Sequence, residues 1–373
     1  MTDCVVFDEH STVSGHRIAV ATLNKPKALN ALGSDMVALL LPQLRAWQQR
    51  DDVLMVVLDA EGDKAFCAGG DVVSMHRAMA EQPDQVPAEL QDFFTQEYRL
   101  DHLIHTYNKP VLVWGNGIVM GGGLGLMAGA SHRIVTESSR IAMPEITIGL
   151  YPDVGGSWFL NRMPGGSGLF LGLTGASINA TDALYIRLAD HFIPHACKQA
   201  FFDSLLSVEW AHASVDQQLT SICQQWHKEH SEALPAGQVE KHQAMIDRVT
   251  AGNTIGEVVS AILALDDQQD KWLQRAKGSL AAGSPVTMHL VWQQLQRAKS
   301  LSLAECFQME LIMSCRCGEF GEFQEGVRAL LIDKDNNPQW HYANVEAVPE
   351  DVLARFFEAP WGNQPHPLAE LKE

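Results

Sequence analysis

The sequence has no run of apolar residues that approaches the length needed to cross a membrane. Its opening residues, MTDCVVFDEH, also lack the basic start and the apolar core of a secretory signal peptide. We therefore expect a cytoplasmic protein without a membrane partner. The residues leave open a transit sequence that was removed ahead of this chain.

Basic residues are scarce in this chain. Its 373 residues include 27 Lys and Arg against 45 Asp and Glu, which gives a formal net charge of −18. A protein that neutralises many phosphates needs a basic excess, so the composition argues against a nucleic-acid partner. A single small anion could still bind at a local basic patch. Hydrophobic residues make up 46% of the chain, enough for one substantial core and a second, smaller domain.

Cysteines are few: the chain has seven, an odd number, and they are scattered along its length. This fits free thiols in a reducing compartment rather than a disulfide framework. Cys315 and Cys317 stand one residue apart without a second pair or a nearby histidine. His227 and His230 share a helical face at a spacing that metal ligands can use, but a solvated polar face is the more common outcome. We expect no metal site.

The first half of the chain alternates between strand and helix patterns. Residues 5–9 and 17–23 predict a hairpin, and a helix that Ser34 would cap precedes a buried strand over residues 53–60. A helical region around residues 90–105 and further apolar runs continue the alternation. This order indicates an α/β domain.

Beyond about Phe201 the pattern changes to long stretches with helical spacing and few strand signals. One of these helices should begin with Ser284 as its cap and Pro285 in its first turn. We therefore expect two regions: residues 1–205 as an α/β core, and residues 206–373 as a mostly helical C-terminal region.

Two glycine-bearing loops each follow a buried strand. Gly121, Gly122 and Gly123 open an apolar, helix-compatible stretch, where bare N–H groups at a positive helix end can approach an anion. Gly69 and Gly70 lie in the upstream loop DKAFCAGGDV. Glycine pairs more often serve tight turns or close packing. Two such loops could nevertheless give one N–H each to a carbonyl oxygen, and thioester or enolate chemistry requires a two-donor hole of this kind.

Two carboxylates follow the second glycine run. Glu145 and Asp153 stand in separate Pro-acid steps inside a segment that is otherwise nearly free of charge. They are candidates for acid–base work, since paired acids push each other's pKa values apart. Glu145 could activate water as a general base or attack a thioester directly to give an anhydride. The residues do not choose between these two routes.

The chain resembles the enoyl-CoA hydratase/isomerase (crotonase) superfamily in four signature segments, which are in order NKPKALNAL, AFCAGGD, KPVLVWGNGIVMGGGLGLMAGA and MPEITIGLYPDVGG. Three features are similar to a hydrolase subgroup of that superfamily. They are FFTQEYRL with Glu97, the PDVGG sequence around Asp153, and the late segment EFQEGVRALLIDKDNNPQW. The similarity spans nearly the whole chain.

The resemblance implies an α/β fold in which repeated ββα units wind into a crotonase-like spiral, followed by a mostly helical C-terminal region. It places the acyl-CoA site in the core of residues 1–205. It also implies an oxyanion hole made by the backbone N–H groups of Gly70 and Gly122, with Gly122 among the substrate-binding residues.

The resemblance also implies roles for single side chains. By position in the motifs, Glu145 matches the catalytic glutamate of the superfamily, and Asp153 matches the second acid of the hydrolase subgroup. Both would contact the substrate, and Glu97 matches a glutamate of the subgroup's substrate pocket. Lys25 and Lys27 lie in a segment that resembles the turn beside the nucleotide part of CoA, where they could meet phosphate.

The activity implied by the resemblance is hydrolysis of the thioester of 3-hydroxyisobutyryl-CoA to 3-hydroxyisobutyrate and free CoA, a step of valine breakdown. No cofactor is implied, because CoA is part of the substrate, and a homo-oligomer stays open. A true hydratase carries another glutamate where this chain has Gly125, which disfavours hydration by paired carboxylates. A hydratase or isomerase of the same fold stays as an alternative, as does a crotonase-like interaction protein without turnover.

Overall fold

The computed structural model describes residues 3–211 and 214–372 and divides into two compact units that are interleaved along the chain. Unit 1 comprises Met1–Gly70, Leu100–Ile141 and Ile178–Gly237. Unit 2 comprises Asp71–Arg99, Ala142–Ser177 and Gln238–Glu373. The expected division after residue 205 is a division along the chain and stays a prediction, since both units draw on segments from either side of it.

Unit 1 is built on a six-stranded sheet. Its strands are β1 (Val5–Ser11), β2 (Arg17–Leu23), β3 (Val53–Ala60), β5 (Val111–Gly115), β7 (His132–Val135) and β9 (His191–Phe192), and they are neighbours in this order. β1 and β2 pair antiparallel, which confirms the predicted hairpin, and the later neighbours pair parallel. β5 is buried along its whole length, as an interior parallel strand should be.

A second sheet has three short strands, β4 (Ala65–Cys67), β6 (Ile118–Met120) and β8 (Arg140–Ala142), which are neighbours in that order. Along the chain β3 leads to β4, β5 to β6, and β7 to β8. Each of these strand pairs therefore places its first strand in the six-stranded sheet and its second in the three-stranded sheet, and each pair is followed by a helix or a helical turn. This repeat is the ββα spiral that the resemblance implies, and the mixed α/β class is confirmed.

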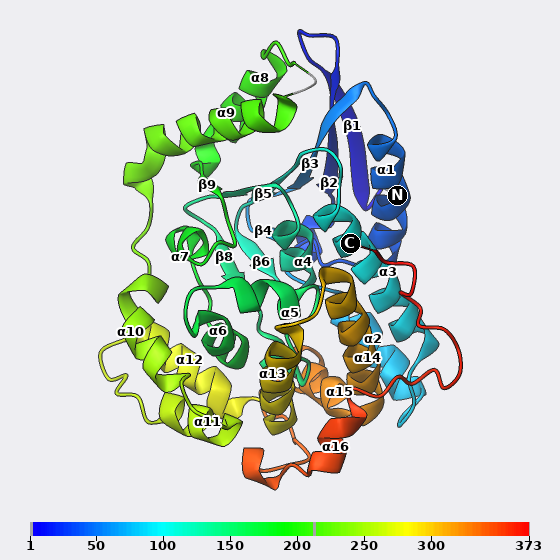
Figure 1. The fold of residues 1–373 in the computed structure, drawn as a ribbon, viewed down its shortest axis with the longest axis vertical. Helices are drawn as coiled ribbons and strands as arrows, with labels where there is room; N and C mark the ends of the chain where they lie inside the picture. Colours follow the sequence, from blue (N-terminus) through cyan, green and yellow to red (C-terminus); the bar gives the residue numbers. More distant parts are fainter. Residues whose placement is uncertain (1–2, 212–213, 373) are drawn as a thin grey trace. The chain divides into compact units, whose positions relative to one another are not determined.

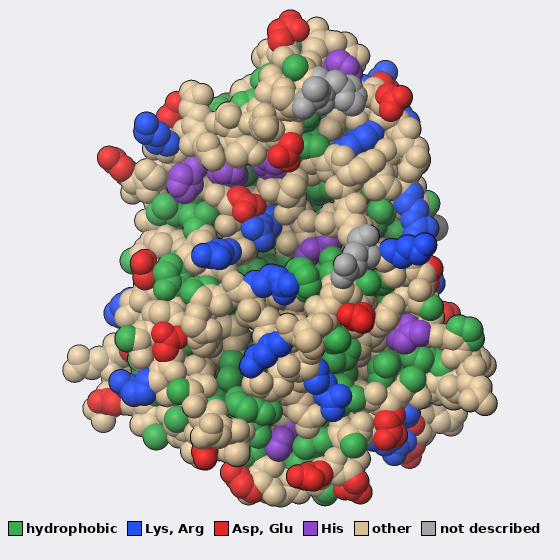
Figure 2. All heavy atoms as spheres, viewed as in Figure 1, with side chains coloured by type: hydrophobic (Ala, Val, Ile, Leu, Met, Phe, Trp, Pro, Cys, Tyr) green, Lys and Arg blue, Asp and Glu red, His purple; other side chains and the backbone are tan. Residues whose placement is uncertain are grey.

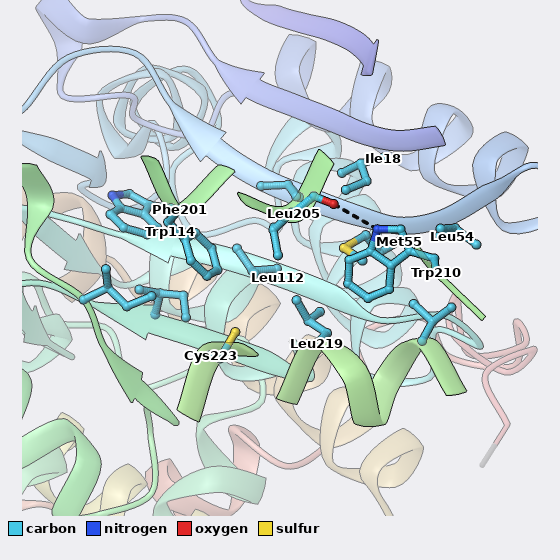
Figure 3. Close-up of a cluster of buried hydrophobic side chains, with 14 residues drawn as sticks. Ile18, Leu54, Met55, Leu112, Trp114, Phe201, Leu205, Trp210, Leu219 and Cys223 are labelled. Atoms are coloured by element: carbon cyan, nitrogen blue, oxygen red, sulfur yellow. Dashed lines mark hydrogen bonds between the residues drawn. The ribbon is translucent and has the colours of Figure 1, made fainter. Parts of the chain in front are cut away.

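The helices of unit 1 are α1 (Ser34–Gln48), α4 (Gly122–Ala128), α7 (Ala180–Tyr185), α8 (Lys198–Leu206) and α9 (Val215–His230), and α3 (Ala88–His105) ends in this unit. α9 packs against β9 (Figure 1). In Figure 3, Met55 and Leu112 of the sheet lie in one buried cluster with Leu205 and Leu219 of α8 and α9. Trp210 joins this cluster and donates its indole N–H to the Leu205 carbonyl at 2.9 Å. Burial of each such side chain contributes roughly 1.5–3 kcal/mol to folding.

Unit 2 consists mainly of helices. They are α2 (Val72–Glu81), α5 (Gly156–Phe159), α6 (Ser167–Thr174), α10 (Val239–Val249), α11 (Ile255–Leu263), α12 (Lys271–Ala282), α13 (Pro285–Ala298), α14 (Leu303–Phe320), α15 (Glu322–Val327) and α16 (Glu350–Arg355). α10 and α12 pack against α6, and α11 packs against α10 and α12 (Figure 1). α13 begins as predicted, because Ser284 accepts from the Thr287 N–H and Pro285 is the first helical residue. The helical C-terminal region is confirmed.

The predicted start of α1 was wrong by one residue. Ser34 is the first helical residue, and the extended Gly33 is the N-cap. In place of a Ser34 cap, the Asp35 carboxylate accepts from the Met36 N–H at 2.9 Å in the first turn. A carboxylate in the first turn also suits the positive end of the helix.

The surface carries charges of both signs. Figure 2 shows Lys and Arg side chains interspersed with Asp and Glu side chains over the face in view. Within residues 3–211 and 214–372, no helix is both long enough and apolar enough to cross a membrane.

Candidate active site

The two glycine loops predicted from the sequence lie side by side in unit 1. A Cβ built on Gly69 would stand 3.5 Å from the Met120 carbonyl oxygen and 4.0 Å from the Gly121 Cα. Gly69 and Gly121 both have a positive φ, 114° and 47°, in a region that favours glycine. Gly70 and Gly122 follow these two residues directly, so the structure brings both expected N–H donors into one neighbourhood.

The glycine run serves two purposes at successive residues. Gly122 is the first residue of α4, and the first N–H groups of an α-helix have no acceptor within the helix. Its N–H therefore carries part of the positive charge of the helix end and is available to a ligand. Gly123 serves close packing, because a Cβ there would lie 2.3 Å from the backbone oxygen of Cys67 in β4.

A buried asparagine that sequence reasoning missed fixes the turn that carries the two predicted CoA-binding lysines. Asn30 accepts from the Lys25 backbone N–H at 2.8 Å. It donates to the carbonyls of Glu61 and Ala65 at 3.1 and 3.0 Å. Asn30 has a φ of 54°, and asparagine tolerates this left-handed conformation better than most residues. The segment NKPKALNAL thus contains its own anchor.

The two lysines differ in their surroundings. Lys25 Nζ forms an ion pair with the Asp35 carboxylate at 2.8 Å. Lys27 lies exposed in the short 3-10 helix η1 (Pro26–Ala28). Partly exposed ion pairs contribute only about 0–1 kcal/mol. Lys25 could therefore exchange Asp35 for a phosphate at little cost, and Lys27 could bind one without any exchange.

The predicted catalytic acids lie in unit 2. Glu145 opens the 3-10 helix η2 (Glu145–Ile148), and only 5% of its surface is exposed. Among the described residues, Glu145 Oε2 has no hydrogen-bond partner. Burial raises the pKa of Glu145 well above its ordinary value, and the charge of Asp153 raises it further. A raised pKa brings a carboxyl toward the range in which a general base works near neutral pH.

Asp153 precedes a tight turn. The next two residues, Val154 and Gly155, have φ values of 50° and 88°, and the Asp153 carbonyl accepts from the Gly156 N–H at 2.7 Å. The Asp153 side chain is 4% exposed, and burial raises its pKa from 3.8 to about 7. The structure therefore supplies two buried acids of raised pKa within one unit.

Buried hydroxyl groups surround the Asp153 carboxyl. Tyr98 Oη hydrogen-bonds Asp153 Oδ2 at 2.7 Å and lies 2.6 Å from Ser314 Oγ. Ser314 Oγ lies 2.8 Å from Tyr151 Oη. Tyr151 donates to the backbone carbonyl of Glu310 at 2.6 Å. Sequence reasoning missed these polar groups, although Tyr98 stands next to Glu97 in a segment that it singled out.

The side chain of Glu310 holds the turn after Asp153. Its Oε2 accepts from the Gly155 N–H at 2.8 Å and its Oε1 from the Ser157 N–H at 2.9 Å. Burial raises the pKa of Glu310 to about 8, while these two residues oppose part of the rise. Glu310 and Ser314 stand four residues apart on one face of an otherwise apolar stretch of α14. That spacing is the signal that could have found them.

Glu97 is buried on α3, with 2% of its surface exposed. Burial raises the pKa of the neighbouring Tyr98 hydroxyl well above its ordinary value, and the charges of Asp153 and Glu97 add to the rise. Unit 2 thus contains three of the predicted site residues, which are Glu97, Glu145 and Asp153. Unit 1 contains the other four, which are Gly70, Gly122, Lys25 and Lys27.

The residues that sequence reasoning weighed as metal ligands have other contacts. His227 accepts from a backbone N–H of β9 at 2.9 Å, and His230 Nε2 lies 3.6 Å from Cys197 Sγ. Cys315 and Cys317 are buried in α14. In the part of the chain that the structure describes, no group of three or more His, Cys, Asp or Glu side chains could hold a metal ion.

A family model described as enoyl-CoA hydratase/isomerase matches residues 18–357. The 3-hydroxyisobutyryl-CoA hydrolase, mitochondrial, of Danio rerio is 36% identical, over 92% of this chain and 87% of the relative. The protein of the same name from Homo sapiens is 33% identical, over 91% of this chain and 86% of the relative. The small ribosomal subunit protein mS47 of Neurospora crassa is 35% identical, over 94% of this chain and 70% of the relative.

Solved structures match over the same extent. A crystal structure of an enoyl-CoA hydratase from Rhodobacter sphaeroides is 34% identical with a TM-score of 0.81, over 96% of this chain and 98% of that one. A carnitinyl-CoA dehydratase from Mycobacterium thermoresistibile is 31% identical with a TM-score of 0.82, over 96% of this chain and 97% of that one. The fold described above is therefore shared with proteins of known structure.

Proposed function

We propose, from the premise that the chain belongs to the enoyl-CoA hydratase/isomerase family, that it hydrolyses the thioester of 3-hydroxyisobutyryl-CoA to 3-hydroxyisobutyrate and free CoA. Relatives that carry the name of this hydrolase, at 36% and 33% identity, support the proposal. The observation that carries it is the pair of buried acids, Glu145 and Asp153. Burial raises the pKa of both carboxyls, and Glu145 keeps one oxygen without a hydrogen-bond partner among the described residues.

In the proposed reaction, the backbone N–H groups of Gly70 and Gly122 bind the thioester oxygen. Attack at the carbonyl carbon places negative charge on that oxygen, so two preorganised donors stabilise the transition state more than the substrate. Loss of one such donor typically lowers kcat by about 10²–10³. The neighbouring positions of the two glycine loops within unit 1 support this assignment.

Glu145 acts on the same thioester by one of two routes. As a general base it takes a proton from water while the water oxygen bonds to the carbonyl carbon. As a nucleophile it forms an anhydride and expels the thiolate, and water then opens the anhydride. Single-turnover hydrolysis in isotopically labelled water separates the routes, because only the anhydride route can leave the label in Glu145.

The remaining predicted residues bind the two ends of the substrate in this proposal. Asp153 orients the 3-hydroxyl group or assists proton transfer to the departing thiolate, and Glu97 lines the acyl pocket. Lys25 and Lys27 bind phosphates of CoA, with Lys27 the more exposed of the two. The reaction needs no cofactor, because CoA enters as part of the substrate.

Hydration of an enoyl-CoA is the second candidate, since a solved structure described as an enoyl-CoA hydratase is 34% identical to this chain. Hydration by paired carboxylates requires a second acid just after the glycine run. Gly125 stands at that position without a side chain, and α4 contains no acid along its length. The active-site residues therefore favour hydrolysis.

Thiol release from a panel of short acyl-CoAs tests the proposal. We expect 3-hydroxyisobutyryl-CoA and 3-hydroxypropionyl-CoA to exceed isobutyryl-CoA in kcat/KM by as much as ~10⁴, because a site that binds a hydroxyl leaves buried polar groups unpaired without it. Equal kcat/KM for hydroxyisobutyryl-CoA and isobutyryl-CoA would leave only a general thioesterase. Hydration of crotonyl-CoA without thiol release would assign the chain to the hydratases.

The relative named as a ribosomal protein gives the non-catalytic alternative a specific basis. Folded protein that releases no thiol from any member of the panel would favour that alternative. The zebrafish and human relatives are named mitochondrial. The cytoplasmic location expected for this chain is therefore a separate proposal, which fractionation of the source cells tests.

A further inference from the structure

Four short oxygen–oxygen contacts connect Asp153 to a helix carbonyl within unit 2. Asp153 Oδ2 lies 2.7 Å from Tyr98 Oη, which lies 2.6 Å from Ser314 Oγ. Ser314 Oγ lies 2.8 Å from Tyr151 Oη, which lies 2.6 Å from the backbone oxygen of Glu310. All five residues are buried. Three hydroxyls form this hydroxyl chain, those of Tyr98, Ser314 and Tyr151.

The hydrogens available to the hydroxyl chain can be counted from its carbonyl end. Each contact at this distance needs one hydrogen between its two oxygens. The Glu310 carbonyl can only accept, so it takes the hydrogen of Tyr151. Ser314 must then donate to Tyr151, and Tyr98 must donate to Ser314. The three hydroxyls have given all their hydrogens, and the contact between Tyr98 and Asp153 still needs a fourth.

We propose that Asp153 supplies this fourth hydrogen: Asp153 is a neutral carboxylic acid in the resting protein, and Tyr98, Ser314 and Tyr151 are positioning residues that hold its proton on Oδ2. An ionised Asp153 could only accept. One pair of buried oxygens would then face each other at hydrogen-bond distance with no hydrogen between them, which is unfavourable. A proton on Asp153 satisfies all four contacts at once.

The electrostatic surroundings of Asp153 also favour the neutral acid. The titratable groups that interact with its charge are themselves acids, namely Glu145, Glu310, Tyr98, Tyr151 and Cys317. None of these can become a cation that would offset a buried negative charge, and such a charge is costly without a cationic partner. Burial raises the pKa of Asp153 to about 7, although hydrogen bonds from Tyr98 and from the backbone to an ionised carboxylate would lower it. Burial also keeps both tyrosine hydroxyls protonated.

The consequence for catalysis rests on the proposed function. Two carboxyls that interact separate in their pKa values, so that one keeps a proton while the other ionises. Electrostatics alone give the opposite order, because the charge of Asp153 raises the pKa of Glu145 and no charge of Glu145 raises that of Asp153. The hydroxyl chain reverses this order by keeping the proton on Asp153, so that Glu145 is the acid that ionises and can serve as base or nucleophile. Tyr98, Ser314 and Tyr151 then determine the order in which the two acids titrate without contacting the reacting atoms.

Ser314→Ala tests the inference, because it removes one oxygen from the hydroxyl chain without touching Asp153. Tyr98 is then free to donate to an ionised Asp153, so the pKa of Asp153 should fall by roughly one pH unit. Infrared titration of the carbonyl stretch of the protonated acid measures this pKa. Carbon-13 aspartate separates the band from those of glutamates, and Asp153→Asn assigns it.

Ser314→Ala should shift the pKa values of Asp153 and Glu145 in opposite directions. An ionised Asp153 repels charge on Glu145, so the pKa of Glu145 should rise, and the limb of kcat/KM that depends on ionised Glu145 should move to higher pH. Tyr151→Phe also frees a hydrogen for Asp153 and should shift the Asp153 band in the same direction. It keeps the test decisive if Ser314→Ala does not fold.

Ser260→Ala on the exposed face of α11 is the matched control and should change neither titration. An Asp153 band with the same midpoint in the wild type and in Ser314→Ala would overturn the inference. So would an Asp153 that is already ionised in the wild type at mildly acid pH. A wild type without thioester hydrolysis would count against the proposed function alone, because the infrared titration needs no substrate.

Discussion

Glu145 combines a buried side chain with an oxygen that has no partner among the described residues. Replacement by glutamine keeps its shape and removes only the ability to take up a proton or to attack. We expect Glu145→Gln to fold normally and to lower kcat for thioester hydrolysis on the order of 10²–10⁴. Thiol release by the purified variant, with circular dichroism as the check on folding, measures this. Near wild-type turnover would remove Glu145 from the mechanism.

Asp153 links the stability of the protein to pH. Burial raises its pKa from 3.8 to about 7 in the folded state. The folded protein therefore keeps a proton that the unfolded chain has already released above about pH 4, so the free energy of unfolding should fall as the pH rises from about 4 to about 7. Above about pH 7, Asp153 causes no further fall in the free energy of unfolding.

Asp153→Asn has no proton to release and should lack this part of the decline, on the order of a few kcal/mol. Urea unfolding of the variant and the wild type at both ends of the range measures the difference. Glu310 and Glu145, whose pKa values burial also raises, contribute their own declines to both proteins. Their declines should be smaller in the variant, because the Asp153 charge that raises both pKa values is absent, so the two effects of the substitution have the same sign. Parallel pH curves for the two proteins would show that Asp153 has an ordinary pKa.

At the scale of elements, α4 depends on close contact with β4. A Cβ on Gly123 would lie 2.3 Å from the Cys67 backbone oxygen, which cannot move aside without distorting β4. We expect Gly123→Ala to lower the free energy of unfolding by about 1–3 kcal/mol, as other overpacked sites do. Thermal unfolding measures the change.

Gly278 in α12 offers a matched control for this substitution, because a Cβ there would meet nothing within 4 Å. Alanine is favoured over glycine in a helix interior by about 1 kcal/mol, so Gly278→Ala should stabilise the protein. If Gly278→Ala is destabilised instead, the stability lost in Gly123→Ala would reflect a general effect of replacing a helical glycine and not the contact with Cys67.

Elements with local signals could be predicted from the sequence. The Ser284–Pro285 start of α13 and the glycine-led α4 carry their instructions in adjacent residues. The hydroxyl chain could not be predicted in this way, since Ser314 meets Tyr98 across 216 positions of sequence. Periodicity shows that Glu310 and Ser314 lie on an otherwise apolar face of α14, but it does not predict which residues will form hydrogen bonds with them.

At the scale of the whole molecule, the interleaving of the two units was also beyond sequence reasoning. Unit 2 gathers Asp71–Arg99, Ala142–Ser177 and the last third of the chain into one compact body. A change in periodicity near Phe201 marks where strands give way to helices, and this is a different property from where contacts cluster. The family resemblance was what connected Gly70, Gly122 and Glu145 to one activity, because no local pattern relates them.

The net charge of −18 should oppose the approach of an acyl-CoA, whose phosphates are also negative. Salt screens charges over about 10 Å at 0.1 M, so added salt should raise kcat/KM for hydrolysis by roughly two- to threefold from low ionic strength. The local cation at Lys27 should act against this repulsion. Lys27→Ala should therefore lower kcat/KM and make the rise with salt steeper.

Lys299→Ala changes the net charge equally, at an exposed position in the other unit, and should leave kcat/KM nearly unchanged. Steady-state kinetics of the three proteins across a salt series measure both effects. Equal losses in the two lysine variants would mean that only net charge matters and would remove Lys27 from CoA binding. A wild-type kcat/KM that falls with salt would mean that local cations outweigh the −18 charge in drawing in the substrate, because screening would then remove an attraction instead of a repulsion.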